Sequence, residues 1–158
     1  MRFDSDKTFD ELRDDLLADI GAEPAQITGL RALADRDWNA FEADVQRQAG
    51  PSDFMLMHLI DHTSWLSTAG VDRKALRVIL GNPLIAITMI RHDLTAGLFA
   101  PVEVLLTEVD DNRSALTYVK PSSLMVVDDN PPLHAAALIL DDKLAALAEK
   151  VSSTGDAP

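Results

Sequence analysis

The residues best suited to chemistry lie together near the middle of the chain. Asp61-His62-Thr63-Ser64 places a carboxylate, an imidazole and two hydroxyl groups directly after an apolar segment. An imidazole oriented by a carboxylate can serve as a general acid or base near neutral pH. His62 is therefore the candidate catalytic residue, with Asp61 as its orienting group, and the alternative is a turn with a solvent-exposed histidine. No Gly-x-Ser-x-Gly motif is present, so the sequence does not predict a serine hydrolase with that motif.

Two histidines and two methionines in the same region raise the question of a metal site. His58 and His62 are four positions apart, which places them within about 6 Å on a helix but about 13 Å apart in an extended chain. The apolar residues around His58 favour the extended chain. Met55 and Met57 alternate with apolar neighbours as ordinary strand fillers, and no third sulfur ligand for Cu(I) accompanies them. We therefore expect no metal ion and no other cofactor.

Asn82 and Tyr118 are the candidate ligand-binding residues outside this region. Asn82 stands directly before Pro83, an arrangement typical of a helix N-cap followed by the first helical residue. The same helix end could bind a small anion through free backbone N–H groups and the helix dipole. Tyr118 would supply a hydroxyl group to that site or lie half-buried on its strand.

We expect Asp61, His62, Asn82 and Tyr118 to meet at one rim of the sheet, within about 10 Å of one another, as a metabolite-sized pocket. Two functions fit this expectation. The first is a small-molecule-binding or accessory protein, and the second is an enzyme of unassigned class in which His62 acts as general acid or base. The sequence favours the first, because the signal for catalysis is confined to one histidine.

Residues 77–93 contain the elements that would position Asn82. Residues 78–80 are apolar and β-prone, Gly81 permits a change of direction, and Pro83 is preset for the start of a helix. In the helix that follows, residues 84–90 are apolar except for Thr88. Such a helix must be covered on nearly all sides, so we predict a core element on which the rest of the chain packs.

Elements before this stretch follow from local patterns. A short strand at residues 2–5 precedes a helix that begins at Phe9, where Thr8 and Glu11 form a capping box. A second helix is predicted near residues 36–49 behind Asp37. Residues 54–60 are apolar at nearly every position, which is typical of a central strand buried on both faces.

Elements after residue 93 complete an α+β fold. Residues 102–109 and 114–119 are two strands joined by the tight connection 110–113, which indicates an antiparallel hairpin. Asn130 then caps a helix that opens with Pro131, and its buried stripe is formed by Leu133, Ala137, Leu140, Leu144, Leu147 and Val151. We predict a two-layer, mainly antiparallel sheet of about five strands with helices packed on it.

Length and charge limit the remaining possibilities. A chain of 158 residues suits a single domain, with residues 152–158 as a disordered tail. The net charge is −12 without a basic cluster, so we expect no nucleic-acid binding. No apolar run has the roughly 20 residues of a membrane span, and no signal peptide precedes the domain, so we expect a cytoplasmic protein without membrane contact. The absence of cysteine excludes thiol chemistry.

Several segments together resemble the bacterial and archaeal family known as domain of unknown function 302. They are Gly81-Asn82-Pro83-Leu84-Ile85-Ala86, Ala100-Pro101-Val102, Tyr118-Val119-Lys120-Pro121-Ser122-Ser123-Leu124 and the leucine-rich closing helix. The resemblance implies a β-α-β(4)-α layout similar to the TATA-binding-protein-like fold, with residues 25–50 as an insertion, a homodimer, and no established activity. Many relatives carry Cys-Asn-Pro and Pro-Cys where this chain has Gly81 and Val102, so a thiol role cannot apply here.

Overall fold

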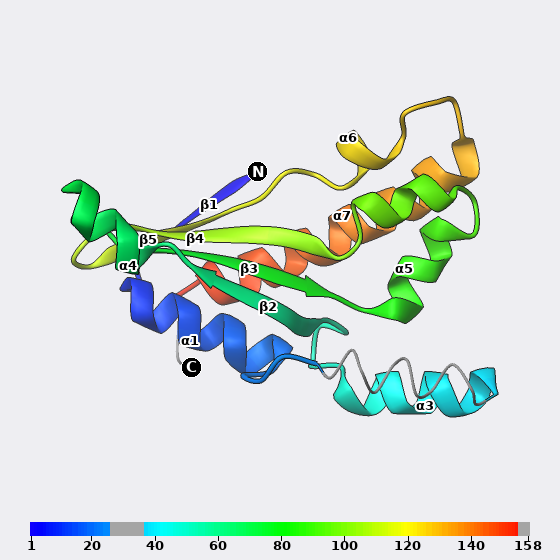
Figure 1. The fold of residues 1–158 in the computed structure, drawn as a ribbon, viewed down its shortest axis with the longest axis horizontal. Helices are drawn as coiled ribbons and strands as arrows, with labels where there is room; N and C mark the ends of the chain where they lie inside the picture. The colour runs from blue at the N-terminus through cyan, green and yellow to red at the C-terminus, as the bar shows by residue number, and fades with distance from the viewer. Residues whose placement is uncertain (26–36, 155–158) are drawn as a thin grey trace.

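Five strands form one antiparallel sheet in the order β1-β5-β4-β3-β2 (Figure 1). The computed structural model describes residues 1–25 and 37–154. The strands are β1 (Arg2–Ser5), β2 (Met55–Asp61), β3 (Ala75–Gly81), β4 (Val102–Asp110) and β5 (Arg113–Thr117). Each neighbouring pair is antiparallel, which confirms the predicted sheet and the hairpin formed by β4 and β5.

The helices begin where the sequence places capping residues. They are α1 (Phe9–Ile20), α3 (Trp38–Gln48), α4 (Thr63–Leu66), α5 (Pro83–Ile90), α6 (Ser122–Met125) and α7 (Pro131–Ser152), with 3-10 turns η1 (Ser67–Ala69) and η2 (Leu94–Leu98). Thr8 and Glu11 form the predicted capping box. The side chains of Asp37, Asn82 and Asn130 each accept a backbone N–H in the first turn of the following helix. Because a cap depends only on neighbouring residues, local sequence was sufficient to find it.

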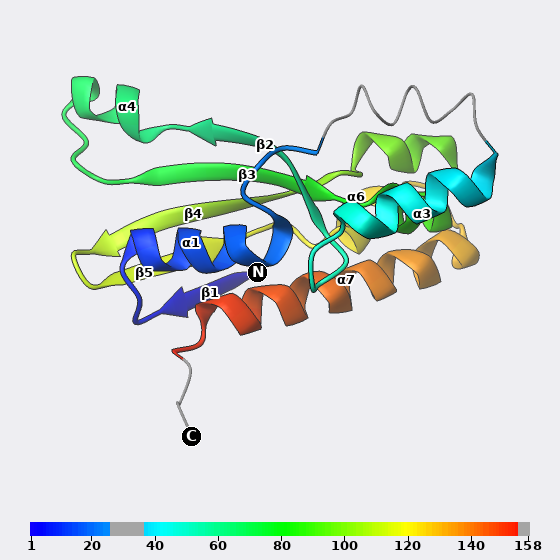
Figure 2. The same cartoon turned by 90° about the horizontal axis from the view of Figure 1, so that it is seen from below.

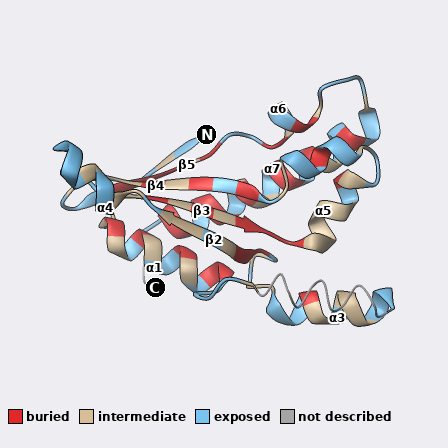
Figure 3. Ribbon diagram, viewed as in Figure 1, coloured by how far each residue is buried: buried red, intermediate tan, exposed pale blue. Residues whose placement is uncertain are grey.

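One face of the sheet is covered by α1 and α7, which lie next to each other (Figure 2). The hydrophobic core lies between these helices and the inward side chains of the strands. Leu12 and Leu16 of α1 and the predicted stripe of α7 are buried in it. Val78, Val104 and Leu116 face it from three different strands. Along β4, buried and more exposed residues alternate (Figure 3), as expected when one face of a strand is covered.

The prediction that residues 54–60 form a central strand is wrong in position, because β2 lies at the edge of the sheet. Its first residues, Met55 and Leu56, are buried, but His58 and Asp61 are exposed. A register shift between Leu56 and His58 interrupts the ladder with β3. The strand is apolar on two sides because Leu56 faces the core while Met57 lines a pocket beneath α5.

The prediction that α5 is a core element covered on nearly all sides is also wrong. Met89 is its only fully buried residue among positions 83–90. The helix leaves the end of β3 and extends past the sheet (Figure 1), where it contacts α7, η2 and α3. Its other apolar residues are half-buried, and its one polar residue, Thr88, is exposed. Apolar composition therefore reflects pockets next to α5 as well as the core.

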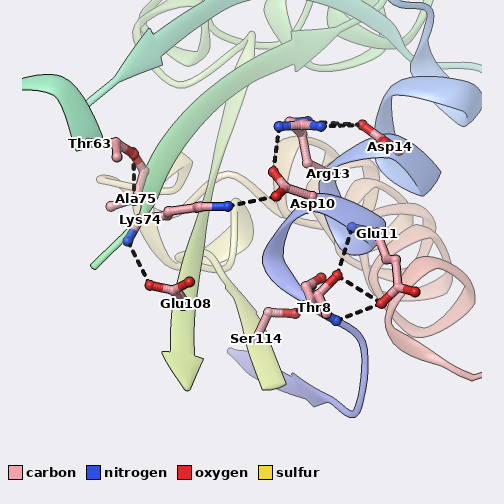
Figure 4. Close-up of polar contacts among 10 residues, drawn as sticks. All are labelled: Thr8, Asp10, Glu11, Arg13, Asp14, Thr63, Lys74, Ala75, Glu108 and Ser114. Carbon is pink, nitrogen blue, oxygen red and sulfur yellow. Dashed lines mark hydrogen bonds and ion pairs between the residues drawn. The ribbon is translucent and has the colours of Figure 1, made fainter. Parts of the chain in front are cut away.

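Polar contacts attach α1 to the start of β3 (Figure 4). Lys74 Nζ lies 2.6 Å from Asp10 Oδ2, and Arg13 Nη1 lies 2.7 Å from Asp10 Oδ1. The hydrogen bond from Lys74 is the main reason that the pKa of Asp10 falls below its ordinary value. The backbone N–H of Lys74 also donates to Glu108 of β4. These contacts fix α1 over the end of the sheet where β2 and β3 are joined.

Candidate functional site

The sheet face opposite α1 and α7 carries a groove of about 490 Å³, which we call the open-face groove. Arg77, Leu105 and Thr117 form its floor, one from each of β3, β4 and β5. They are direct partners across the sheet, because Arg77 pairs with Leu105 and Leu105 with Thr117. Their neighbours in sequence, such as Val104 and Leu106, point into the core. Strand alternation thus sends one set of residues to the core and the other to the groove.

Apolar side chains line one end of the groove. Leu98 comes from η2, Val119 follows β5, and Leu124 belongs to α6. Leu98 is 80% exposed, Val119 61% and Leu124 40%. Phe99 lies beside them. Large apolar side chains gathered around a concavity are typical of a surface that binds a ligand or another protein.

An ion pair supplies the charged groups of the groove. Arg77 Nε donates to Glu103 Oε2 at 2.9 Å, and the two side chains are 41% and 47% exposed. One group offers N–H donors and the other oxygen acceptors. The pair is electrically neutral in a chain whose net charge is −12. The groove therefore presents balanced charge inside an acidic protein.

His62 lines the groove, but Asp61 does not orient it. Asp61 Oδ1 instead accepts a hydrogen bond from the backbone N–H of Thr63 at 2.8 Å. His62 Nδ1 accepts from the indole N–H of Trp65 at 3.3 Å, and the two rings meet edge to face. Since an indole nitrogen can only donate, Nε2 carries the proton when this histidine is neutral. The predicted pairing of Asp61 with His62 is therefore wrong.

Tyr118 also lines the groove, although the residue as a whole is only 5% exposed and belongs to the hydrophobic core. Its ring stacks on Phe3 with centroids 5.9 Å apart. Burial raises the pKa of the Tyr118 hydroxyl, and the carboxylates of Asp141 and Glu149 on α7 raise it further. The hydroxyl is therefore protonated at neutral pH.

Asn82 acts as a structural cap at the other end of β3. Its Oδ1 accepts from the N–H of Leu84 at 2.8 Å, and its Nδ2 donates to the carbonyl oxygen of Asp53 at 2.7 Å. The N–H groups of Ile85 and Ala86 both bond to the backbone oxygen of Asn82. Pro83 has no N–H. Every first-turn amide is thus already bonded, and this helix end offers no free donor to the small anion that the sequence predicted.

The four predicted site residues therefore do not converge. Asp61 pairs with Leu76 at one end of β3, whereas Asn82 follows the other end, about 20 Å away along the strand. His62 and Tyr118 line the open-face groove. Asn82 instead lines the hollow beneath α5 and a third hollow of about 550 Å³ between α3, α5 and α7. Asp61 lines none of these three hollows. The prediction that all four lie within about 10 Å is wrong.

Sequence reasoning missed the groove floor and its apolar end. Arg77 offered a weak signal, because it is a charged residue inside the apolar run of β3. Glu103 gave the same signal at the start of β4. Their adjacency follows from the strand order, which the sequence does not reveal. In the described parts of the chain, no group of three or more His, Cys, Asp or Glu residues could hold a metal ion.

A second hollow of about 230 Å³ lies beneath α5, and we call it the α5 pocket. Its lining includes Met57 of β2, Ala86 of α5 and Leu140 of α7. Pro101 and Val102 line both this pocket and the open-face groove. The two hollows are therefore adjacent.

Fold and site together define an α+β protein with an open antiparallel sheet, covered by helices on one face and hollowed on the other. The chain belongs to the family described as domain of unknown function DUF302, whose model matches residues 31–151. The "Crystal structure of uncharacterized conserved protein DUF302 from Bacillus stearothermophilus" is similar, with a TM-score of 0.66, 16% identity and 97% coverage of both chains. At that identity the likeness shows the fold alone. No curated protein matches the chain.

No helix within residues 1–25 and 37–154 is both long enough and apolar enough to cross a membrane.

Proposed function

We propose that this protein binds a small molecule in the open-face groove and does not consume it. The observation that carries the proposal is the groove itself, a hollow of about 490 Å³ over Arg77, Leu105 and Thr117. Ligand pockets commonly have volumes of about 300–1,000 Å³, with mostly apolar walls and a few polar groups that fix orientation. The groove has both features.

The chemistry of the lining restricts the ligand. The apolar part of the lining, which includes Pro101 and Val102, suits a hydrocarbon portion. The Arg77–Glu103 pair suits a polar portion that accepts from the guanidinium and donates to the carboxylate. A neutral or zwitterionic polar group meets both demands. A simple anion would satisfy Arg77 but face Glu103 and the acidic surface of the chain.

A thermal-shift screen with neutral and zwitterionic metabolites tests this proposal, because a bound ligand stabilises the folded state by mass action. A ligand at 100 times its Kd should raise the free energy of unfolding by about 2.7 kcal/mol. Arg77→Gln should abolish that stabilisation. Arg47→Gln on α3 is the matched control, because Arg47 is exposed and lines none of the three hollows. Stabilisation that survives Arg77→Gln and Glu103→Gln unchanged would place the ligand outside the groove.

We also propose that the protein forms a homodimer, in which a second copy covers the apolar end of the groove. Leu98 and Leu124 are exposed there, and such a cluster favours burial against a partner. Sedimentation should show a dimer that Leu98→Asp converts to a monomer. Leu94→Asp provides the control, because Leu94 is 82% exposed on the same turn but does not line the groove. A concentration-independent monomer of the unmodified chain would contradict the proposal.

The second candidate function is an enzyme in which His62 transfers a proton, and the presence of His62 in the groove lining favours it. The hydrogen bond from Trp65 occupies Nδ1, so Nε2 is the nitrogen that would face a substrate. Turnover of a groove ligand that is lost in His62→Ala and retained in His58→Ala would establish catalysis. Binding that occurs without turnover and is unchanged in His62→Ala would contradict the enzyme function and support the binding function only.

A further inference from the structure

The α5 pocket is almost entirely apolar. Asn82 is the only one of its lining residues that has a polar side chain. Both ends of that amide are already bonded, one to Leu84 and the other to Asp53. A buried water needs two to four polar partners, and apolar cavities of about 150 Å³ stay dry and take up benzene. At about 230 Å³, the α5 pocket has room for a hydrocarbon group and lacks side-chain partners for water.

Small residues keep this pocket open. Gly81, Ala86 and Ala100 line it from β3, α5 and the segment before β4. A Cβ atom added to Gly81 would come within 2.9 Å of Pro101 Cβ, so the two segments are already in close contact at that point. Ala86 is one of the smallest lining residues, so a larger side chain at this position would take up part of the pocket.

The α5 pocket and the open-face groove meet at Pro101 and Val102, which line both. Glu103 follows Val102 directly and belongs to the ion pair in the groove. The ion pair and the α5 pocket therefore lie on either side of a two-residue segment shared by both hollows. Neither hollow alone offers this combination of a charged pair and an almost wholly apolar space.

We propose that the groove ligand is amphipathic, with a polar head at the Arg77–Glu103 pair and an alkyl or aryl tail in the α5 pocket. This inference rests on the proposed binding function and specifies the ligand class. The head both donates and accepts hydrogen bonds, as a carboxamide does. The tail is somewhat larger than benzene, because the α5 pocket exceeds the volume of cavities that bind benzene.

Butanamide, pentanamide and hexanamide are suitable probes, with Kd measured by isothermal titration calorimetry. The expected result is an affinity that rises up to about fourfold for each added CH2 group, the gain from burying one methylene. Ala86→Leu should remove this dependence on chain length by filling the α5 pocket. Ala146→Leu is the matched control, because it adds the same atoms at an exposed position of α7, and it should bind like the unmodified chain.

The outcomes separate this inference from the proposed function. Affinity that does not change with chain length, or a dependence that survives Ala86→Leu, overturns the tail site. If the polar ligands from the thermal-shift screen still bind in a way that depends on Arg77, the proposed binding function of the groove stands without the tail site. A chain-length dependence that Ala86→Leu removes but Arg77→Gln leaves intact would uphold the α5 pocket and contradict the head site. Should Ala86→Leu fail to fold, Met57→Phe fills the same pocket from β2 and repeats the test.

Discussion

The two faces of the sheet are built from neighbouring residues yet have different surroundings. On β4, Leu106 is buried beneath helices, whereas Leu105 directly before it lies on the floor of the open-face groove. Both are leucines in one strand. The comparison shows that an apolar residue in a strand indicates contact with something apolar, which can be the core of the chain or a surface available to a partner.

The largest expected effect on the free energy of unfolding distinguishes the covered face of the sheet from the open face. Leu106→Ala should lower the free energy of unfolding by about 2–5 kcal/mol, because it leaves a cavity in the core. Leu105→Ala should cost less than about 1 kcal/mol, since its side chain is partly exposed already. Urea denaturation of both variants provides the measurement. Equal losses would show that the groove face is covered in solution.

The next effect concerns Asn82, which joins the helix end to the chain before β2. Asn82→Ala should cost about 2 kcal/mol, about half from the lost cap and half from the lost hydrogen bond to Asp53. Asn82→Gly should cost about 1 kcal/mol, because glycine is an acceptable cap but cannot make that bond. If urea denaturation shows no difference between Asn82→Gly and the unmodified chain, the hydrogen bond to Asp53 does not contribute to the free energy of unfolding.

A smaller effect on the covered side depends on pH. The hydrogen bond from Lys74 lowers the pKa of Asp10 in the folded state. A depressed carboxyl pKa gives stability that is fully present above the unfolded value near 4 and is lost as pH falls through the lower pKa of the folded state. Asp10 is 49% exposed, so the contribution should stay below about 1 kcal/mol. Asp10→Asn and Lys74→Gln should each be less stable than the unmodified chain at pH 6, and the difference should shrink as pH falls through the lowered pKa of Asp10. A difference that stays constant as pH falls would assign the loss to packing.

The smallest effect on stability is expected on the open face. Arg77→Gln should change the free energy of unfolding by less than about 0.5 kcal/mol, because the pair with Glu103 is exposed. The same variant should lose ligand binding in the groove. Urea denaturation measures the effect on stability, and calorimetry measures the effect on ligand binding. A loss of several kcal/mol in the free energy of unfolding would mean that Arg77 stabilises the fold.

Local features were predictable and spatial ones were not. Thr8, Asp37 and Asn130 were recognised as caps because each acts on residues within one helical turn. The edge position of β2 depends on which strands lie beside β3, and the residues of β2 do not indicate the strand order. Likewise, Arg77, Leu105 and Thr117 are neighbours only through the register of three strands. His62 and Tyr118 line the groove, and their role in ligand binding stays a prediction, but the neighbours assigned to them were wrong for the same reason.

The pairing of β1 with β5 also has a consequence for synthesis on the ribosome. The amino group of Met1 donates to the backbone oxygen of Tyr118, a contact between residues 117 positions apart. Strand β1 therefore leaves the exit tunnel long before its partner exists, and α1 follows it without the sheet on which it packs. The nascent chain must keep Phe3 and the apolar side of α1 from other partners until β5 is made. Only when α7 has also emerged can the covered face close.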